Sequence, residues 1–599
     1  MEMTFRIVFA PELVLLAAVL GAMIFKIRLM QPAAAGPLGV AVARHDAGYI
    51  ALVAGFFALA CALNRLRSYG RWLGRTAFVI AEVCAATCLL LVILYVADVL
   101  VYRFFLTRLY ASDIVTFSRE THAGFTLSRS GLRGFFHHTP WKLAALAGGI
   151  FVFLRAVVLL FRPAKWNPRG LAAAVFAVVL LTVWLYPISD RFYSFDDKPL
   201  YENLLERNRD YFEQSNFSDG FRAKVLSTPE PVSWVAGTNR RIDVLLVVVE
   251  SLSAFQSQYF SGIEDWTPQL DDIARHETAM TNFHANGWTT IGGLISLLTG
   301  TVPLVPEHTA FNTYGSPRLP DFSNETPSLP LALEKMGYRT EFIGGGDLDF
   351  TGKDTWLKDV GFQKLIGGDD PVYSAQKLRG PFNSVPDRVL YDVTLDELNK
   401  TQKESPRFVV VETVWTHRPF LDENGNPLSD EEPVFRLADR QLGSFYRKLV
   451  ASHFLDHGLL IIVGDHRGPL PFRQVEFQRF GESAVARIPA IMATRAFPLP
   501  HVIAQDFQQR DLLASIESLV SGGAWLRPEE GTFLTNPPHP PRCILHARGD
   551  DRDLVLVTCG SQEAVVRVAG DNTRFIKGQV PDEDLILETI NRTRVRRAQ

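Results

Sequence analysis

The long apolar runs of this 599-residue chain lie almost entirely in its first third, and no other feature constrains the fold as strongly. Five runs approach or exceed the length that a helix needs to span the hydrocarbon layer of a membrane. They cover residues 7–25, 47–63, 77–102, 143–161 and 170–188. Pro11 and Glu12 interrupt the first run, and no small-residue cleavage site precedes a soluble domain, which argues against a signal peptide. The sequence therefore predicts a transmembrane domain of five helices over residues 1–188.

Basic residues in the short loops between these runs predict the orientation of that domain. The second loop holds Arg65, Arg67, Arg71 and Arg75, and the fourth loop holds Arg162, Lys165 and Arg169. Short loops rich in arginine and lysine stay on the cytoplasmic side of a membrane. We therefore expect the C-terminal two-thirds of the chain to lie outside.

Charge and cysteine content narrow the function further. A net charge of -3, with no long basic run in the interior, gives no support to nucleic-acid binding. The arginine-rich end, residues 592–597, is interpreted as a solvated tail. Cys543 and Cys559 flank a polar turn between two apolar stretches, so they either form a disulfide in an oxidising compartment or remain buried free thiols.

From residue 241 onward, short apolar runs alternate with helical periodicity, which is typical of an α/β sheet. Residues 242–249 form a continuous, mostly β-branched run that suits a buried parallel strand. Further strands are expected at 338–343, 407–413 and 458–463, and helices at 291–299, 327–336, 434–452 and 510–521. Thr267 and Pro268 open another helix as N-cap and first helical residue.

The expected organisation outside the membrane has three parts. Residues 189–240 are predicted to be a linker with a surface helix, residues 241–530 the α/β domain, and residues 531–599 a small C-terminal β subdomain and tail. The last part alternates apolar and polar residues between turn signals, which favours antiparallel strands.

Polar side chains follow several of the predicted strands. Glu250 ends the first run, His417 follows the strand at 407–413, and Asp465 and His466 follow the strand at 458–463. Each residue alone is as well explained as a cap or a turn. Ligands of open parallel sheets gather at the carboxyl ends of the strands, and these acidic and imidazole groups together would need a cation.

Thr290 lies at the start of an apolar helix and adds a hydroxyl to this set. Backbone amides at a helix start favour an anion such as an alkoxide or a phosphate. A divalent metal held by these groups can turn the hydroxyl into a nucleophile. The alternative is that Thr289 or Thr290 is only an N-cap. Gly292 and Gly293 are expected to let a bulky substrate approach the backbone.

Several short stretches have the residues and the order of a known family. They are 246–251 (Leu-Val-Val-Val-Glu-Ser), 282–290 with 297–300 (Leu-Leu-Thr-Gly), 416–420 (Thr-His-Arg-Pro-Phe), 464–468 (Gly-Asp-His-Arg-Gly) and 487–490 (Arg-Ile-Pro-Ala). Together they resemble the sulfatase-like branch of the alkaline phosphatase superfamily, and most of all its lipoteichoic acid synthases and periplasmic-glucan phosphoglycerol transferases. Residues 345–362 are especially similar to the glucan-modifying group. The resemblance implies an extracytoplasmic mixed sheet flanked by helices.

The resemblance also implies roles for matching residues. Glu250, Thr290, Asp465 and His466 would hold one divalent metal, Mn²⁺ before Mg²⁺ or Zn²⁺, and Thr290 would be the nucleophile. His417 would contact the phosphate or protonate a leaving alkoxide. Lys353, which replaces an arginine of lipoteichoic acid synthases, would bind the phosphoglycerol, and Trp356 would line the pocket. The sequence Thr-Ile-Gly-Gly after the nucleophile position departs from the signature of true sulfatases, so sulfate hydrolysis is not expected.

These roles describe a multi-pass enzyme of the bacterial inner membrane whose catalytic domain faces the periplasm. It would move phosphoglycerol from an anionic lipid, phosphatidylglycerol, through a phosphothreonine to a periplasmic glucan or another surface glycan. Three alternatives remain: a phosphoethanolamine transferase that uses phosphatidylethanolamine, a hydrolase that releases glycerol phosphate, and a non-catalytic receptor with the same fold.

Overall fold

The structure is a computed structural model that describes residues 46–53, 71–105, 108–110, 203–213, 218–304, 328–400, 405–469, 472–535, 542–549 and 551–597, with single residues between 55 and 63. The chain divides into two compact units. Among the described residues, those up to Asp210 and residues 472–474 belong to the first unit, and the others belong to the second.

The first unit contains helix α3 (Arg71–Phe105), which includes the apolar run predicted at 77–102. Near its end, the buried Asp98 carboxylate pairs with the Arg108 guanidinium at 2.6 Å. Within the described ranges, no helix combines the length and the hydropathy needed to cross a membrane. The runs at 7–25, 143–161 and 170–188 lie outside those ranges, and the run at 47–63 is described only in part. The five-helix domain therefore stays a prediction.

A mixed eight-stranded sheet organises the second unit, in the order β10-β3-β9-β8-β2-β7-β5-β6. Its strands are β2 (Asp243–Val249), β3 (Thr278–Met280), β5 (Arg339–Gly344), β6 (Lys364–Ile366), β7 (Arg407–Glu412), β8 (Gly458–Gly464), β9 (Ala490–Ala493) and β10 (Val502–Ile503). Strand β9 is antiparallel to its two neighbours, and the other pairings are parallel. The prediction of a mixed α/β sheet is confirmed.

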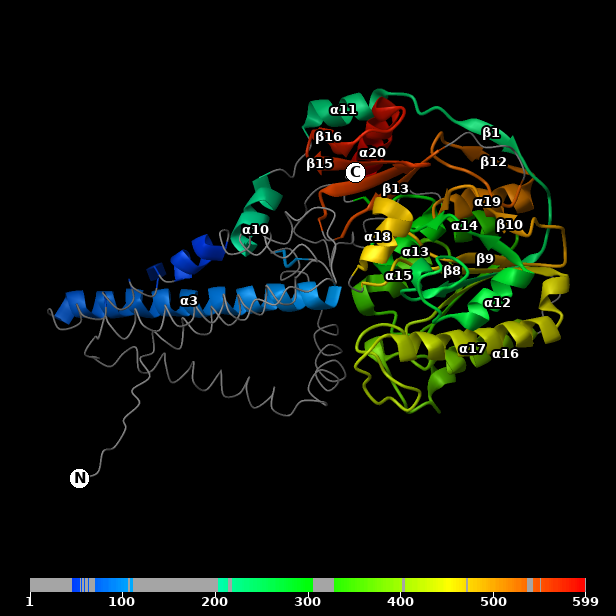
Figure 1. Ribbon diagram of the computed structural model, residues 1–599, viewed down its shortest axis with the longest axis horizontal. Helices are drawn as coiled ribbons and strands as arrows, with labels where there is room; N and C mark the ends of the chain where they lie inside the picture. Colours follow the sequence, from blue (N-terminus) through cyan, green and yellow to red (C-terminus); the bar gives the residue numbers. More distant parts are fainter. Residues whose placement is uncertain are drawn as a thin grey trace. The chain divides into compact units, whose positions relative to one another are not determined.

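The central strand β2 sends alternate side chains into two cores, as the period of an extended chain requires. Leu246 and Val248 face one core, and Leu245 and Val247 face the other. The first core includes residues of α13 (Thr290–Thr299), α14 (Leu329–Lys335) and α19 (Asp511–Ser521). The second core includes residues of α12 (Pro268–His276), α16 (Asp387–Asn399) and α17 (Glu432–Ala451). The sheet therefore lies between two helical layers (Figure 1).

The C-terminal part forms a separate antiparallel sheet of four strands, as the sequence predicts. Its strands are β13 (Cys543–Ala547), β14 (Leu554–Cys559), β15 (Gln562–Ala569) and β16 (Asn572–Gly578). Cys543 and Cys559 lie opposite each other in β13 and β14 and form a disulfide, so the first of the two alternatives is confirmed. Val302 and Leu304, which follow α13, share a core with this sheet.

The prediction of a solvated arginine-rich tail was wrong. The end of the chain is helix α20 (Glu583–Arg597), and the side chains of Arg592 and Arg594 are buried. Arg592 donates to the carbonyl of Thr228 next to α11 (Asp219–Ser227), and Arg594 donates to the carbonyl of Gly570. Composition suggested solvent exposure, but both guanidinium groups are buried and donate to backbone carbonyls of other segments.

Candidate active site

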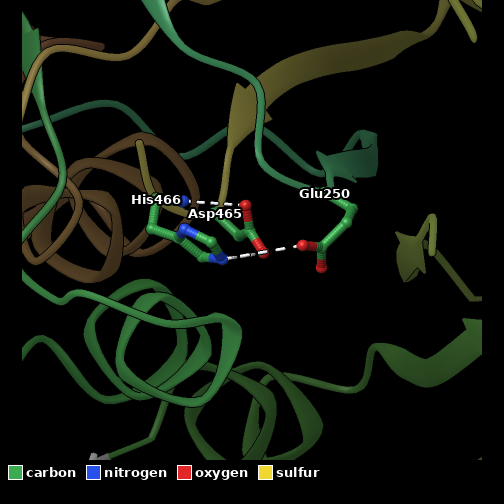
Figure 2. Close-up of side chains that lie close together, drawn as sticks. All are labelled: Glu250, Asp465 and His466. Carbon is green, nitrogen blue, oxygen red and sulfur yellow. Dashed lines mark hydrogen bonds and ion pairs between the residues drawn. The ribbon is translucent and has the colours of Figure 1, made fainter. Parts of the chain in front are cut away.

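Two adjacent parallel strands bring the acidic residues of the site together. Glu250 directly follows β2, Asp465 directly follows β8, and the register pairs Val249 with Gly464. Figure 2 shows Glu250, Asp465 and His466 converging, and one ligand atom from each lies within 4.8 Å of the others. His466 Nε2 lies 3.3 Å from Asp465 Oδ2 and 3.7 Å from Glu250 Oε1.

Thr290 joins this cluster from helix α13. Its hydroxyl donates to Glu250 Oε2 at 3.0 Å and lies 3.5 Å from His466 Nε2. The N-cap position belongs to Thr289, so Thr290 is the first helical residue and its hydroxyl points to the cluster. The side chain is partly exposed, whereas the other three residues are buried. A hydroxyl held by a buried carboxylate and open to solvent has the position expected of a nucleophile.

The interpretation of Gly292 and Gly293 as substrate-facing positions was wrong. A Cβ on Gly293 would lie 2.2 Å from the carbonyl oxygen of Asp465, and a Cβ on Gly287 would lie 2.7 Å from the Cα of Gly292. These glycines let the first turn of α13 pack against the end of β8 and against the preceding loop. Their function is to bring Thr290 to Asp465 and His466.

Sequence reasoning missed the residues that hold the carboxylates in place. The Ser251 hydroxyl donates to Glu250 Oε1 at 2.7 Å, and the Ser251 amide donates to Asp465 Oδ1 at 2.7 Å. Thr413 and Thr416 hold the Glu250 backbone, since one hydroxyl accepts from its amide and the other donates to its carbonyl. Ser251 has a φ of 58°, an uncommon value for a residue other than glycine and one that clusters at functional sites. Apart from the contact between the neighbours Ser251 and Glu250, these partners come from different strands, so no local pattern marks them.

The electrostatics of the cluster favour a cation. Burial and the neighbouring Asp465 raise the pKa of Glu250 to about 8. Burial opposes the charge of His466, but Asp465 and Glu250 outweigh it and raise the pKa of His466 to about 9. Burial also disfavours the charge of Asp465, yet His466 keeps the pKa of that carboxyl below its usual value. Two ionised carboxylates in this buried site repel each other, and a cation bound between them would offset that repulsion.

The donor set also fits a metal. The second carboxylate oxygen of Asp465, Oδ2, is buried without a hydrogen-bond partner. The Nδ1 atom of His466 lies 2.9 Å from the Arg467 carbonyl, which leaves Nε2 facing the cluster. Carboxylate oxygens with an imidazole nitrogen and a hydroxyl suit Mn²⁺, Mg²⁺ or Zn²⁺.

The three residues expected to contact substrate lie in different surroundings. His417 follows β7, is half-buried, and has its Nδ1 2.6 Å from the Arg418 carbonyl. Burial lowers the pKa of His417 to about 4, so the ring is neutral at neutral pH. Lys353, which opens α15 (Lys353–Asp359), contacts both oxygens of the buried Glu412 at 2.8 and 2.9 Å. No sequence pattern predicts the pairing of Lys353 with Glu412.

Trp356 has a different position from the one that its expected role requires. Its side chain is fully buried in the first core, where it packs with residues such as Leu357 and Phe342. A side chain with no exposed surface cannot line an open pocket, so we leave Trp356 out of the proposed substrate contacts.

Comparison with known proteins shows what this chain is similar to. Residues 242–522 match the model of the sulfatase family. The matched stretch makes up a little less than half of the 599-residue chain. It contains every residue of the metal cluster, the nucleophile candidate and His417.

The chain is also similar to curated relatives and to a solved structure. The chain is 26% identical over 341 residues to phosphoglycerol transferase I of Xanthomonas campestris, covering 54% of this chain and 45% of that protein. It is 23% identical over 296 residues to phosphoglycerol transferase I of Escherichia fergusonii, covering 46% and 36%. The chain therefore spans less than half the length of these curated relatives. A protein of the alkaline phosphatase superfamily from Vibrio parahaemolyticus has the same fold, with a TM-score of 0.51 and 20% identity over 64% of this chain and 96% of that one.

Proposed function

We propose that this protein is a membrane-anchored, metal-dependent phosphoglycerol transferase. It moves phosphoglycerol from phosphatidylglycerol to a periplasmic glucan or another surface glycan through a phosphothreonine at Thr290. The observation that carries the proposal is the 3.0 Å contact between the Thr290 hydroxyl and Glu250 inside the buried cluster. The curated name of the relatives supports the head group.

In this mechanism Thr290 Oγ attacks the phosphorus of the lipid phosphodiester. Glu250 Oε2 accepts the hydrogen bond of the threonine and takes its proton. The bond between the phosphorus and the diacylglycerol oxygen breaks, the leaving oxygen takes a proton from the Glu250 carboxyl or from water, and a phosphothreonine ester remains. A divalent metal bound by Glu250, Thr290, Asp465 and His466 would lower the pKa of the hydroxyl and offset the charge of the phosphate.

Two further residues prepare the site for the second step. Nδ1 of the neutral His417 ring donates to the Arg418 carbonyl, so Nε2 is an acceptor that can take the proton of an acceptor hydroxyl. Lys353 places an ammonium group near β7 and β5, where it can attract the phosphoglycerol while Glu412 holds the ammonium group in position.

A membrane anchor suits this reaction, because the acyl chains of the lipid donor stay in the bilayer while its head group is transferred. We place the protein in the bacterial inner membrane, with five spans in residues 1–188 and this domain in the periplasm.

Covalent labelling tests the proposal. The purified full-length protein is incubated with head-group-labelled phosphatidylglycerol and Mn²⁺, without acceptor, and the labelled peptide is mapped by mass spectrometry. We expect label on Thr290, none in Thr290→Ala, and retained label in Thr290→Ser, which keeps a hydroxyl. Label on another residue, or full turnover in Thr290→Ala, would contradict the nucleophile assignment. An ethanolamine phosphate on Thr290 in cells would show that the donor is phosphatidylethanolamine.

A further inference from the structure

A strained turn lies beside the active site. Phe382 and Asn383 have φ values of 51° and 56°, in the left-handed region that residues other than glycine rarely adopt. The turn is held in this shape from several sides. The Asp347 amide donates to the Phe382 carbonyl at 2.9 Å, and the Val385 amide donates to the Gly345 carbonyl at 2.9 Å. Backbone strain maintained by its surroundings is a feature of functional sites.

The turn directs the Phe382 ring toward His417. The two rings meet edge to face with centroids 4.6 Å apart. On another side, the ring of Phe350 lies 4.8 Å from the ring of Phe382. Phe350, Phe382 and His417 are each partly exposed, so the two phenylalanines form an aromatic wall that solvent can reach.

The wall adjoins the atom that handles the entering hydroxyl. With Nδ1 bonded to the Arg418 carbonyl, the Nε2 atom of His417 is the acceptor of the ring. Thr416, the residue before His417, donates to the Glu250 carbonyl at 2.7 Å, so His417 lies next to the metal cluster. When the hydroxyl of an acceptor molecule reaches His417 Nε2, the rest of that acceptor must therefore lie close to the aromatic wall.

We propose that the aromatic wall is the subsite for the sugar ring of the acceptor. This inference rests on the proposed function. The apolar C–H face of a sugar packs on an aromatic ring, while its hydroxyls need polar neighbours. The wall has such neighbours in the chain, since Asp349 and Asn383 adjoin the two phenylalanines and are exposed and half-exposed. Two partly exposed rings match one sugar better than they match a pair of acyl chains.

The transfer step needs only Thr290, His417, the acceptor hydroxyl and water. The acceptor hydroxyl oxygen forms a bond to the phosphorus, and the bond between Thr290 Oγ and the phosphorus breaks. The proton of the acceptor hydroxyl passes to His417 Nε2, and the threonine oxygen recovers a proton from His417 or water. A sugar seated on the wall presents its hydroxyl between Nε2 and the phosphothreonine.

The test compares two acceptors in the full-length protein. Glycerol has hydroxyls but no ring face, whereas an oligomeric glucan has both. Phe382→Asn removes the ring but suits the left-handed turn, since asparagine tolerates that conformation. Phe382→Trp restores an aromatic face. Trp525→Asn removes an aromatic side chain that is 62% exposed on β12 (Gly523–Leu526), outside the site, and is the matched control.

We expect Phe382→Asn to reduce the ratio of transfer to glucan over transfer to glycerol at least tenfold, through a higher KM for glucan. Phe382→Trp should restore the ratio, and Trp525→Asn should leave it at the wild-type value. An equal fall with both acceptors would overturn the inference, because the ring would then only position His417. A matching fall in Thr290 labelling without acceptor would also overturn it and assign the wall to the lipid. Absence of Thr290 label in the wild type would instead contradict the proposed function itself.

Discussion

At the scale of single residues, the active site depends on the smallest side chain as much as on the ionisable ones. Gly293 lies one turn into α13, where its Cα faces the carbonyl of Asp465. The Cβ of any larger residue would clash with the Asp465 carbonyl oxygen and push α13 away from β8. The contact between Thr290 and the carboxylates exists because this position has no side chain.

We therefore expect Gly293→Ala to destabilise the domain by about 2 kcal/mol or more, the cost typical of overpacking. It should also lower Thr290 labelling at least tenfold, because the hydroxyl moves away from Glu250. Gly220→Ala in α11 is the control, since a Cβ there meets no atom within 4 Å. Thermal unfolding and labelling measure both effects. Equal stability and labelling in the two variants would disprove the packing argument.

Asp387 makes a pH-dependent contribution to the free energy of unfolding. This residue opens α16, is 1% exposed, and accepts a hydrogen bond from the Trp415 amide at 3.4 Å. Burial raises its pKa to about 7, although backbone donors of Trp415 and Val414 oppose the shift. The pKa of Asp387 in the folded protein lies above the value of about 4 in the unfolded chain. Its contribution to the free energy of unfolding is therefore complete below pH 4 and is lost as the pH rises to 7.

Asp387→Asn should remove this pH dependence, because the amide does not ionise. The lost term is at most about 1.4 kcal/mol per pH unit between pH 4 and 7. Unfolding midpoints at pH 5 and pH 8 should differ less in the variant than in the wild type. The opposite result, an equal or larger difference in the variant, would mean that Asp387 is already ionised in the fold.

At the scale of elements, the C-terminal sheet supports the loop that leads to the nucleophile. Asn286 Nδ2 donates to the Leu545 carbonyl at 2.7 Å, and the Ala547 amide donates to the Asn286 carbonyl at 2.8 Å. Strand β13 thus holds the segment just before Thr290. What the sequence presents as an appendage is part of the support of the active site.

The disulfide of this sheet should accordingly affect both stability and activity. It closes a loop with a sequence separation of 16, which by chain entropy corresponds to about 3 kcal/mol. We expect reductant to lower the unfolding midpoint of the wild type and to reduce Thr290 labelling. The double variant Cys543→Ser with Cys559→Ser should resemble the reduced protein and show no response to reductant. A response of the double variant would point to another reducible group.

At the scale of the whole molecule, the cluster connects α13, β2 and β8, so a bound ion should stabilise the entire second unit. A divalent metal at a hundred times its Kd contributes about 2.7 kcal/mol. Mn²⁺ should raise the unfolding midpoint, and EDTA should reverse the rise. Asp465→Asn should lose most of this response, whereas Asp349→Asn, at an exposed carboxylate outside the cluster, should keep it. An unchanged response in Asp465→Asn would place the metal elsewhere.

Much of the fold and the core of the site could be predicted from the sequence. The β-branched runs before Glu250 and Asp465 have local patterns that hold wherever the chain is packed, and strand ends in a parallel sheet necessarily share an edge. The short strands β3, β6, β9 and β10 escaped prediction because two to four residues are too few to show a period.

By itself, then, the sequence determined which residues could form a metal cluster with a nucleophile, since residue type and strand position are local properties. Only the tertiary structure decided how they are held. The contacts that hold them join segments far apart in the chain. They are Ser251 with Asp465, Lys353 with Glu412, Gly293 with the Asp465 carbonyl, and the buried arginines of α20 with distant carbonyls. Such contacts form when packing brings those segments together, so no short stretch of the sequence includes both partners.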